Sequence, residues 1–167
     1  TGKGFEFLAE MERMHMIVDV SHLSDKGFWD IARHSTRPFA ASHSNCRALA
    51  PHTRNLTDEM IRALSERGGI AGLNYYAPFL DTDPTHPENC RSTVELIAKH
   101  AAHYKQVGGA QMIALGSDFD GIDGPHQLEN AAFLPLLADA LRKEGFTEDE
   151  VEGIYFRNAM RFFEENL

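Results

Sequence analysis

The chain has 167 residues, of which 43% are hydrophobic and 25% are charged, a composition typical of one globular domain with enough chain to bury a core. Its 16 Lys and Arg against 25 Asp and Glu leave a formal net charge of −9, which speaks against nucleic acid and anionic membranes as partners. Because no apolar run approaches the roughly 18 residues of a transmembrane helix, we expect no membrane contact.

The numbers of cysteines and histidines indicate which kinds of chemistry the chain can support. Two cysteines, Cys46 and Cys90, are too few for a disulfide framework and fit a reducing compartment. The sequence leaves the compartment open, with a cytoplasmic location favoured. No leader segment is visible at Thr1, and the polar end, EENL, carries no anchor signal. Nine histidines are many for this length, and they indicate metal or acid–base chemistry.

Helical and strand-like patterns alternate along the first half of the chain. Apolar residues at helical spacing after a Ser or Thr cap predict helices, and short β-rich apolar runs predict strands. In chain order, the pattern predicts a helix over 4–14 capped by Thr1, a strand over 16–20, a helix through KGFWDIARH capped by Ser24, a strand over 37–42, a helix from Thr57 to Gly68–Gly69 and a strand over 69–75.

The second half continues this alternation. Four apolar strands separated by helices indicate βα units on a parallel sheet. Four such units make either half of an eight-stranded barrel or a small open sheet, and no glycine-rich phosphate loop supports a nucleotide-binding sheet. The predicted elements are a helix over 92–107 ended by Gly108–Gly109, a strand over 111–117, a helix over 127–144 closed by Gly145, a helix through TEDEVEGIYF capped by Thr147 and a last helix through NAMRFFEENL.

Polar residues follow the predicted strands at the point where each strand ends. His22 follows the first strand, His43 the second and Asp118 the fourth. Because parallel strands bring their carboxyl ends to one rim, which in a barrel is the active-site face, we expect these side chains to meet. Imidazoles suit zinc, and a nearby carboxylate can take a proton from metal-bound water. The pattern therefore indicates a zinc site.

Each of these residues also has a simpler interpretation. A single histidine at a strand end is more often a satisfied polar group than a metal ligand, and Asp118 with Asp120 and Gly121 could form only a turn. His100 and His103, three residues apart on one predicted helix, fit a solvated helix face better than a metal site. We expect the other histidines away from the rim to lie at the surface or in loops.

Two arginines and a cysteine lie in the segment after His43. Either Arg47 or Arg54 could hold a substrate carboxylate through paired hydrogen bonds, or either could face solvent, and the pattern does not decide between these alternatives. Cys46 has no partner base in the pattern, so we interpret it as a small buried residue and not as a nucleophile.

Five segments taken together resemble a known enzyme family. In order along the whole chain, they match the membrane (renal) dipeptidase family, which consists of zinc dipeptidases of the amidohydrolase superfamily. Any one segment alone would be a weak signal, whereas the set is highly specific. The segments are MIVDVSHLS (16–24), ASHSNCRAL (41–49), TRNLTDE (53–59), IALGSDFDGI (113–122) and NAMRFF (158–163).

The resemblance implies an α/β fold of the (β/α)8 barrel type and a site with two zinc ions. By resemblance, His22 and His43 are metal ligands at the ends of the fifth and sixth strands. By the same resemblance, Asp118 corresponds to the catalytic acidic residue after the eighth strand, which handles the substrate amino group and protons. Arg54 resembles the arginine that binds the terminal carboxylate of a dipeptide. The implied reaction is hydrolysis of dipeptides, including those with a C-terminal D-residue, by a hydroxide that bridges the two zinc ions.

The chain also departs from the family pattern. The family uses a His-x-Asp pair, a bridging Glu and a further histidine from its N-terminal half, and this sequence contains no His-x-Asp. We therefore expect residues 1–167 to be a single partial domain, the C-terminal half of the barrel, and to lack dipeptidase activity alone. The expected partners are a small dipeptide and the missing N-terminal half, on the same or another chain, and family members are often homodimers.

Two other functions fit the same residues. A related metal hydrolase of the amidohydrolase type would act on another amide, ester or phosphoester, and would hydrolyse C-terminally blocked dipeptides as readily as free ones. A non-catalytic half-barrel kept as an interaction module would retain His22 and His43 only as relics. Such a module would show no tight zinc binding even when paired with its partner half.

Overall fold

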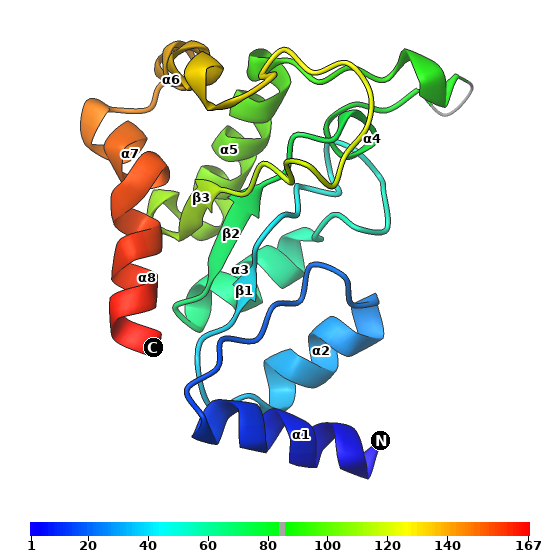
Figure 1. Cartoon of the computed structure of the whole chain (residues 1–167), viewed down its shortest axis with the longest axis vertical. Coiled ribbons are helices and arrows are strands. Elements are labelled where there is room, and N and C mark those ends of the chain that lie inside the picture. The colour runs from blue at the N-terminus through cyan, green and yellow to red at the C-terminus, as the bar shows by residue number, and fades with distance from the viewer. Residues whose placement is uncertain (84–85) are drawn as a thin grey trace.

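The computed structural model describes residues 1–83 and 86–167, and Figure 1 shows helices arranged around a short central sheet. Four predicted helices form close to their expected positions, because the hydroxyl of each Ser or Thr cap accepts a backbone N–H of the first turn. They are α1 (Gly2–Arg13), capped by Thr1, α2 (Asp25–His34), capped by Ser24, α3 (Asp58–Glu66), capped by Thr57, and α5 (Val94–Gly108), capped by Thr93.

The centre of the fold is a parallel sheet, as the apolar runs predicted. A Cβ atom added to Gly72 or Gly116 would collide with the backbone carbonyl of Ser42, so glycine at these positions lets neighbouring backbones approach closely. The sheet thereby brings the ends of its strands together at one rim. Its strands are β1 (Ala40–Ala41), β2 (Ile70–Leu73) and β3 (Ile113–Leu115), hydrogen-bonded in that order.

The prediction of a first strand over 16–20 is wrong in extent. Only an isolated parallel bridge joins Asp19 to Ala40. Val20 N–H donates to the Ala40 carbonyl over 2.8 Å, and Ala40 N–H donates to the Val18 carbonyl over 2.9 Å. Among the described residues this segment pairs with β1 on one side and with no strand on the other, so the ladder stays short.

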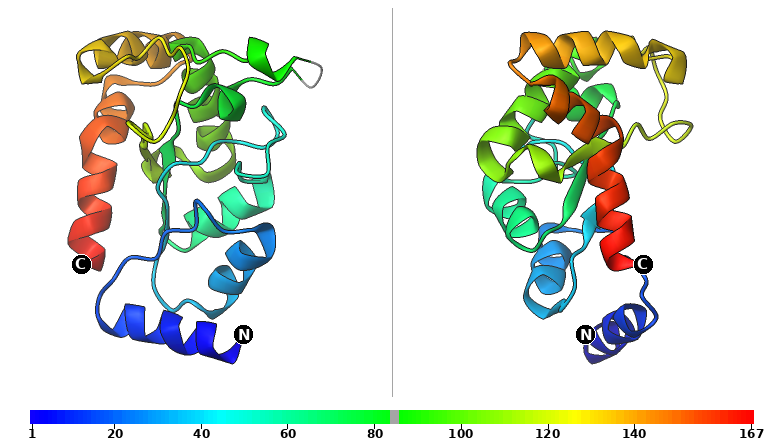
Figure 2. Two further views of the ribbon diagram at one scale, coloured as in Figure 1. Left: turned by 45° about the vertical axis from the view of Figure 1, so that its right-hand side comes forward. Right: turned by 90° about the vertical axis from the view of Figure 1, so that its left-hand side faces the viewer.

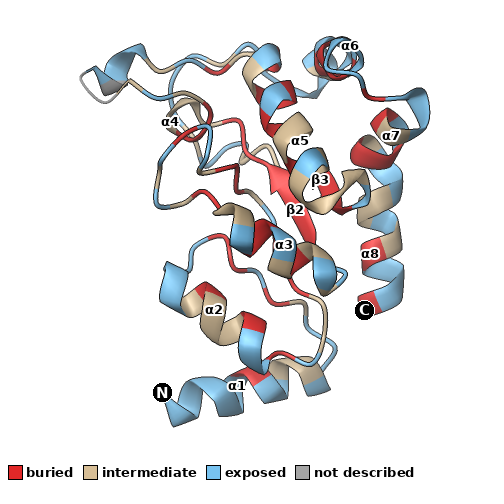
Figure 3. Cartoon of the chain, turned by 180° about the vertical axis from the view of Figure 1, so that it is seen from behind, coloured by how far each residue is buried: buried red, intermediate tan, exposed pale blue. Residues whose placement is uncertain are grey.

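Helices cover both faces of the sheet (Figures 1 and 2). On one face, α3 and α5 pack against Ala71 and Ile113 in the main hydrophobic core. On the other face lies α8 (Asn158–Asn166), whose Phe162 packs against Ile70. Figure 3 shows the buried residues gathered on the sheet and on the sides of the helices that face it. In the described ranges, no helix has the length and apolar character needed to cross a bilayer.

The predicted helix over 127–144 begins later than expected. A 3-10 turn, η3 (Ala131–Phe133), precedes α6 (Leu134–Lys143). Pro135 lies in the first turn of α6, and proline is tolerated there because the N–H it lacks would have no partner inside the helix. The remaining short elements are α4 (Ala77–Leu80), η1 (Pro87–Asn89) and η2 (Ala110–Met112).

The two helices predicted at the end of the chain form one continuous helical segment. It consists of α7 (Glu148–Glu152), a π-helical turn η4 (Gly153–Arg157) and α8. A capping box starts α7, in which Thr147 and Glu150 satisfy each other's backbone N–H groups. The amide of Asn158 donates to the carbonyl of Ile113 over 2.8 Å, which fastens α8 to β3.

Candidate active site

The segments that follow the bridge at Asp19 and strand β1 meet at one rim, as predicted. There the Nε2 atoms of His22 and His43 lie 3.0 Å apart. His43 is half-buried and His22 is exposed. Burial lowers the pKa of His43, although the nearby carboxylates of Asp118 and Asp19 oppose this effect. The neutral imidazole is therefore favoured, and this is the form that binds metal ions.

Asp19 holds His43 through two serines. Its carboxylate accepts the Ser21 N–H over 3.0 Å, the Ser21 hydroxyl over 2.9 Å, the Ser42 N–H over 3.0 Å and the Ser42 hydroxyl. Ser42 Oγ lies 2.7 Å from His43 Nδ1, and the His43 N–H donates to Ser21 Oγ over 3.0 Å. Desolvation would raise the pKa of Asp19, but these hydrogen bonds outweigh it and lower the pKa below its ordinary value. Asp19 is therefore a carboxylate at neutral pH.

Asp118 is held at the same rim by a buried asparagine. The Asn74 side-chain amide donates to the Asp118 carboxylate over 3.0 Å and to the His43 carbonyl over 3.3 Å. Asp118 also forms the predicted turn, since the Gly121 N–H donates to its carbonyl over 2.8 Å. Its φ of 73° is a left-handed conformation that is uncommon outside glycine and gathers at functional sites. Asp118 therefore belongs both to the turn with Gly121 and to the candidate site.

A cavity of about 400 Å³ opens beside the histidines and is lined in part by His22, Arg54, Phe79 and Asp118. Cavities of roughly 300–1,000 Å³ are typical for small ligands. Arg54 donates from Nε to the Ser21 carbonyl over 2.6 Å, and its guanidinium lies 5.3 Å from the centre of the Phe79 ring. Arg54 Nη2 is buried and has no hydrogen-bond partner among the described residues, so a ligand carboxylate would supply a missing acceptor.

The structure shows which of the two arginines is available to bind a carboxylate, a question that the sequence left open. Arg47 makes a bidentate pair with Asp25, with both distances 2.7 Å. It also donates to the Asn55 carbonyl over 2.8 Å, so its guanidinium is occupied in holding the loop. Arg54 is therefore the arginine that faces the cavity. Cys46 is buried, as predicted.

The prediction that His100 and His103 lie on a solvated helix face is wrong. His100 is fully buried: its Nδ1 accepts the Cys46 N–H over 3.0 Å, and its Nε2 lies 3.1 Å from the Leu80 carbonyl. Burial lowers its pKa to about 4. His103 is mostly buried, 2.7 Å from Asp58. Both residues are used in packing, away from the rim.

Three polar residues that hold the site together are not among the predicted site residues. Asp19, Ser42 and Asn74 lie within the strands predicted over 16–20, 37–42 and 69–75. One sequence feature could have identified them: each is a polar residue in or beside a short apolar strand, where an unsatisfied polar group would destabilise the fold. The sequence does not tell which neighbour each side chain binds.

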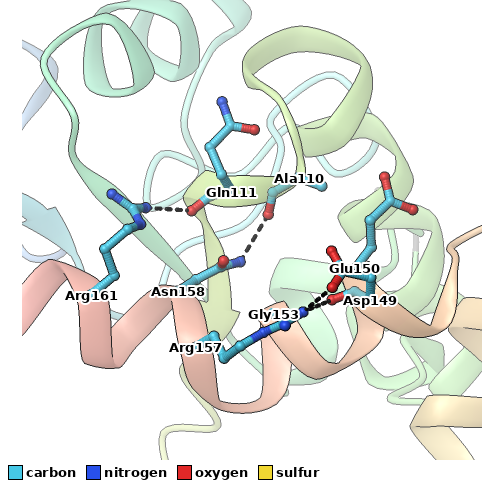
Figure 4. Close-up of a pocket in the computed structure, with 8 residues that line it drawn as sticks. All are labelled: Ala110, Gln111, Asp149, Glu150, Gly153, Arg157, Asn158 and Arg161. Carbon is cyan, nitrogen blue, oxygen red and sulfur yellow. Dashed lines mark hydrogen bonds and ion pairs between the residues drawn. The ribbon is translucent and has the colours of Figure 1, made fainter.

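Another hollow, of about 430 Å³, lies between η2 and the segment from α7 to α8 (Figure 4). Its charged side chains are already paired: Arg157 lies 2.6 Å from the Asp149 carboxylate, and Arg161 donates to the Gln111 carbonyl over 3.0 Å. The Arg157 pair lies within the last helical segment, and the Arg161 contact fastens that segment to the chain before β3. We assign the hollow a structural role.

The rim offers the donor types of a zinc site but too few of them. Residues 1–83 and 86–167 contain no group of three or more His, Cys, Asp or Glu side chains that could hold a metal ion. Two nitrogen ligands of a tetrahedral zinc, each at about 2.0–2.1 Å, stand roughly 3.3 Å apart, which is close to the 3.0 Å between His22 and His43. The pair therefore fits part of a metal site.

A sequence model of the membrane dipeptidase family, peptidase family M19, matches residues 1–166. The chain belongs to this family. It is 38% identical over 161 residues to an uncharacterized Klebsiella pneumoniae protein from the region 5′ of pqqA, and 34% identical over 164 residues to a Claviceps purpurea dipeptidase. It superposes with a TM-score of 0.90 and 33% identity on a metallo peptidase from Rhodobacter sphaeroides liganded with a phosphinate mimic of the dipeptide L-Ala-D-Ala.

The chain spans only part of each of these M19 relatives. The matches include 96% to 100% of this chain. They include only 59% of the Klebsiella protein, 37% of the Claviceps dipeptidase and 47% of the Rhodobacter chain. Its α/β fold thus matches about half of an M19 dipeptidase structure. The family relatives include dipeptidases, which are hydrolases, and a family of metallopeptidases implies a metal cofactor.

Proposed function

We propose that the chain carries the C-terminal half of a zinc-dependent dipeptidase site, built on the strands equivalent to the fifth to eighth of a (β/α)8 barrel. The observation that carries this proposal is the convergence of His22 and His43, whose Nε2 atoms lie 3.0 Å apart. His22 also lines a cavity together with Arg54 and Asp118. Membership of the M19 family and the match to about half of an M19 structure support it.

The residues at the rim have separate roles in this proposal. His22 and His43 hold zinc, which when bound polarises the scissile carbonyl and activates water. Arg54 binds the terminal carboxylate of the dipeptide through the guanidinium nitrogen that has no protein partner. Asp118, kept in place by Asn74, receives the substrate amino group and moves protons.

The proposed substrates are dipeptides, including those with a D-residue at the C-terminal position. The Rhodobacter relative is liganded with a mimic of L-Ala-D-Ala, which supports this substrate class. Arg54 supports it too, because an arginine that binds the C-terminal carboxylate selects peptides whose second residue is the last one.

Two histidines do not complete a site for two zinc ions, so the proposal needs further ligands. We propose that they come from the N-terminal half of the barrel, on the same polypeptide or on another. The 167 residues alone are then inactive, and the functional unit is the closed barrel.

Native and denaturing mass spectra of the purified protein, combined with an L-Ala-D-Ala hydrolysis assay, test the proposal. A longer or companion polypeptide that carries two zinc ions and hydrolyses the dipeptide is the expected result. Turnover clearly above background by the 167 residues as the only protein would overturn the division of the site. A protein that includes the partner half but binds no zinc would instead indicate a non-catalytic module.

A further inference from the structure

Asp19 is an acidic residue on an otherwise apolar face of the sheet. A hollow of about 230 Å³ on this face is lined by Ile17, Ala40 and Ile70, with Asp19 and Ser42 among its polar residues. Asp19 is exposed as a residue, but its carboxylate is partly desolvated, and hydrogen bonds offset the cost of this desolvation. Asp19 accepts four such bonds, all from the two serines that contact His43, so its placement points to a role at that histidine.

Ser42 links Asp19 to His43 by two hydrogen bonds, and the donor of each can be assigned. A carboxylate only accepts, so Ser42 donates its hydroxyl proton to Asp19. The same oxygen then accepts from His43 Nδ1 at 2.7 Å, and Nδ1 must carry the imidazole proton. His43 Nε2 keeps its lone pair and points at His22 Nε2, 3.0 Å away.

We propose that Asp19 is a positioning residue that acts through Ser42 to keep His43 in the tautomer protonated at Nδ1, so that Nε2 is available to a metal ion. This role rests on the proposed function. A second contact strengthens it, because Asp19 also accepts the hydroxyl of Ser21, which in turn accepts the backbone N–H of His43. Metal-binding histidines commonly depend on such a partner at the other ring nitrogen.

Asp19→Asn tests the proposal with almost no change in shape. The amide would donate to Ser42 Oγ, the Ser42 hydroxyl would then donate to His43 Nδ1, and the imidazole proton would move to Nε2. Nitrogen NMR of ¹⁵N-histidine-labelled full chain at pH 8 reads the tautomer directly, since Nδ1–H and Nε2–H forms have distinct shifts. His43→Gln assigns the His43 signals among the nine histidines. The matched control is Asp30→Asn, which changes a partly exposed carboxylate on α2 that is paired with Lys26.

We expect His43 to carry its proton on Nδ1 in the wild type and in Asp30→Asn, and on Nε2 in Asp19→Asn. In the protein that includes the partner half, we also expect Asp19→Asn to lower zinc affinity roughly 10- to 100-fold in titrations with zinc alone. Ser42→Ala, which breaks the link without adding a donor, should leave a mixture of tautomers and give a second reading if Asp19→Asn does not fold. An unchanged tautomer in both variants would overturn the proposal. A tautomer switch in a protein that includes the partner half but binds no zinc would support the positioning role and count against the proposed metal function.

Discussion

The buried amide of Asn74 donates a hydrogen bond to the carboxylate of Asp118 over 3.0 Å, across 44 positions of sequence. The same amide also donates to the carbonyl of His43 over 3.3 Å. Replacing Asn74 with aspartate puts a second carboxylate against the first, and like charges at this distance raise the pKa of one of them. We expect Asn74→Asp to lower the free energy of unfolding at pH 7 by about 1–3 kcal/mol. Because protonation of one carboxyl relieves the repulsion, part of this loss should return at pH 5, as urea unfolding at both pH values will measure.

Asn74→Ala serves as the control for this charge effect. It removes the hydrogen bonds without adding a carboxylate, so its loss of stability should be similar at pH 5 and pH 7. If the two variants show the same pH dependence, repulsion with Asp118 is not the cause.

Arg54→Ala should impair substrate binding in the assembled enzyme. Arg54 lines the cavity with its Nη2 unpartnered among the described residues, and a hydrogen bond to a charged group contributes about 1.5–3 kcal/mol. We therefore expect the KM for free dipeptides to rise roughly 10- to 100-fold. The KM for C-terminally amidated dipeptides should change little, and steady-state kinetics with both substrates measure the difference.

Arg47→Ala is the matched arginine control. Its guanidinium is paired with Asp25 at 2.7 Å, so its removal should lower thermal stability and leave KM nearly unchanged. An equal rise in KM in both variants would argue against a special role for Arg54.

His100 should make the chain sensitive to acid. Burial lowers its pKa to about 4 in the folded state, whereas an unperturbed histidine titrates near about 6.5. The unfolded state therefore takes up a proton first, and stability that is complete above about pH 6.5 is lost as the pH falls toward 4. The difference in pKa between the folded and unfolded states corresponds to a loss of roughly 3 kcal/mol in the free energy of unfolding. Urea unfolding between pH 4 and pH 7 measures it.

His100→Gln identifies the residue responsible. A glutamine can accept from the Cys46 N–H and donate to the Leu80 carbonyl, as His100 does, but it does not titrate. The loss of stability between pH 6.5 and 4 should shrink in this variant and persist in His86→Gln, whose side chain is exposed. An undiminished loss in His100→Gln would assign the acid sensitivity elsewhere.

Gly72→Ala and Gly116→Ala should each destabilise the fold strongly. In both, the new Cβ collides with the carbonyl of Ser42 in the backbone, where no side chain can move aside. We expect a loss of more than about 3 kcal/mol in each, measured by urea unfolding. Gly4→Ala is the control, because its Cβ has ordinary contact distances in α1, and it should stabilise the helix by up to about 1 kcal/mol. Mild effects at Gly72 and Gly116 would show that the strands can separate at the rim.

The sequence predicted features that depend on local interactions. Helix starts at Ser24, Thr57 and Thr147 followed from side chains that satisfy nearby N–H groups. The strand over 16–20 was overestimated, because strand length depends on pairing with distant backbone and here only Ala40 supplies it.

The candidate site was predicted in outline. The positions of His22 and His43 after two strands were enough to expect them at one rim. The burial of His100 could have been found, since it lies on the stripe that includes Ile97 and Tyr104. The links from Asp19 to His43 depend on serine hydroxyl directions, which no spacing rule encodes.

The sheet ends on both sides in backbone that has no further strand partner among the described residues: the segment at Asp19 on one side and β3 on the other. Such edges accept any strand that reaches them, including those of other copies. If the other half of the barrel is covalently attached, it meets these edges at an effective concentration of about millimolar, far above that of a separate polypeptide in a dilute solution. The length and integrity of the connection between the halves would then decide whether the edges close into one barrel or collect into aggregates.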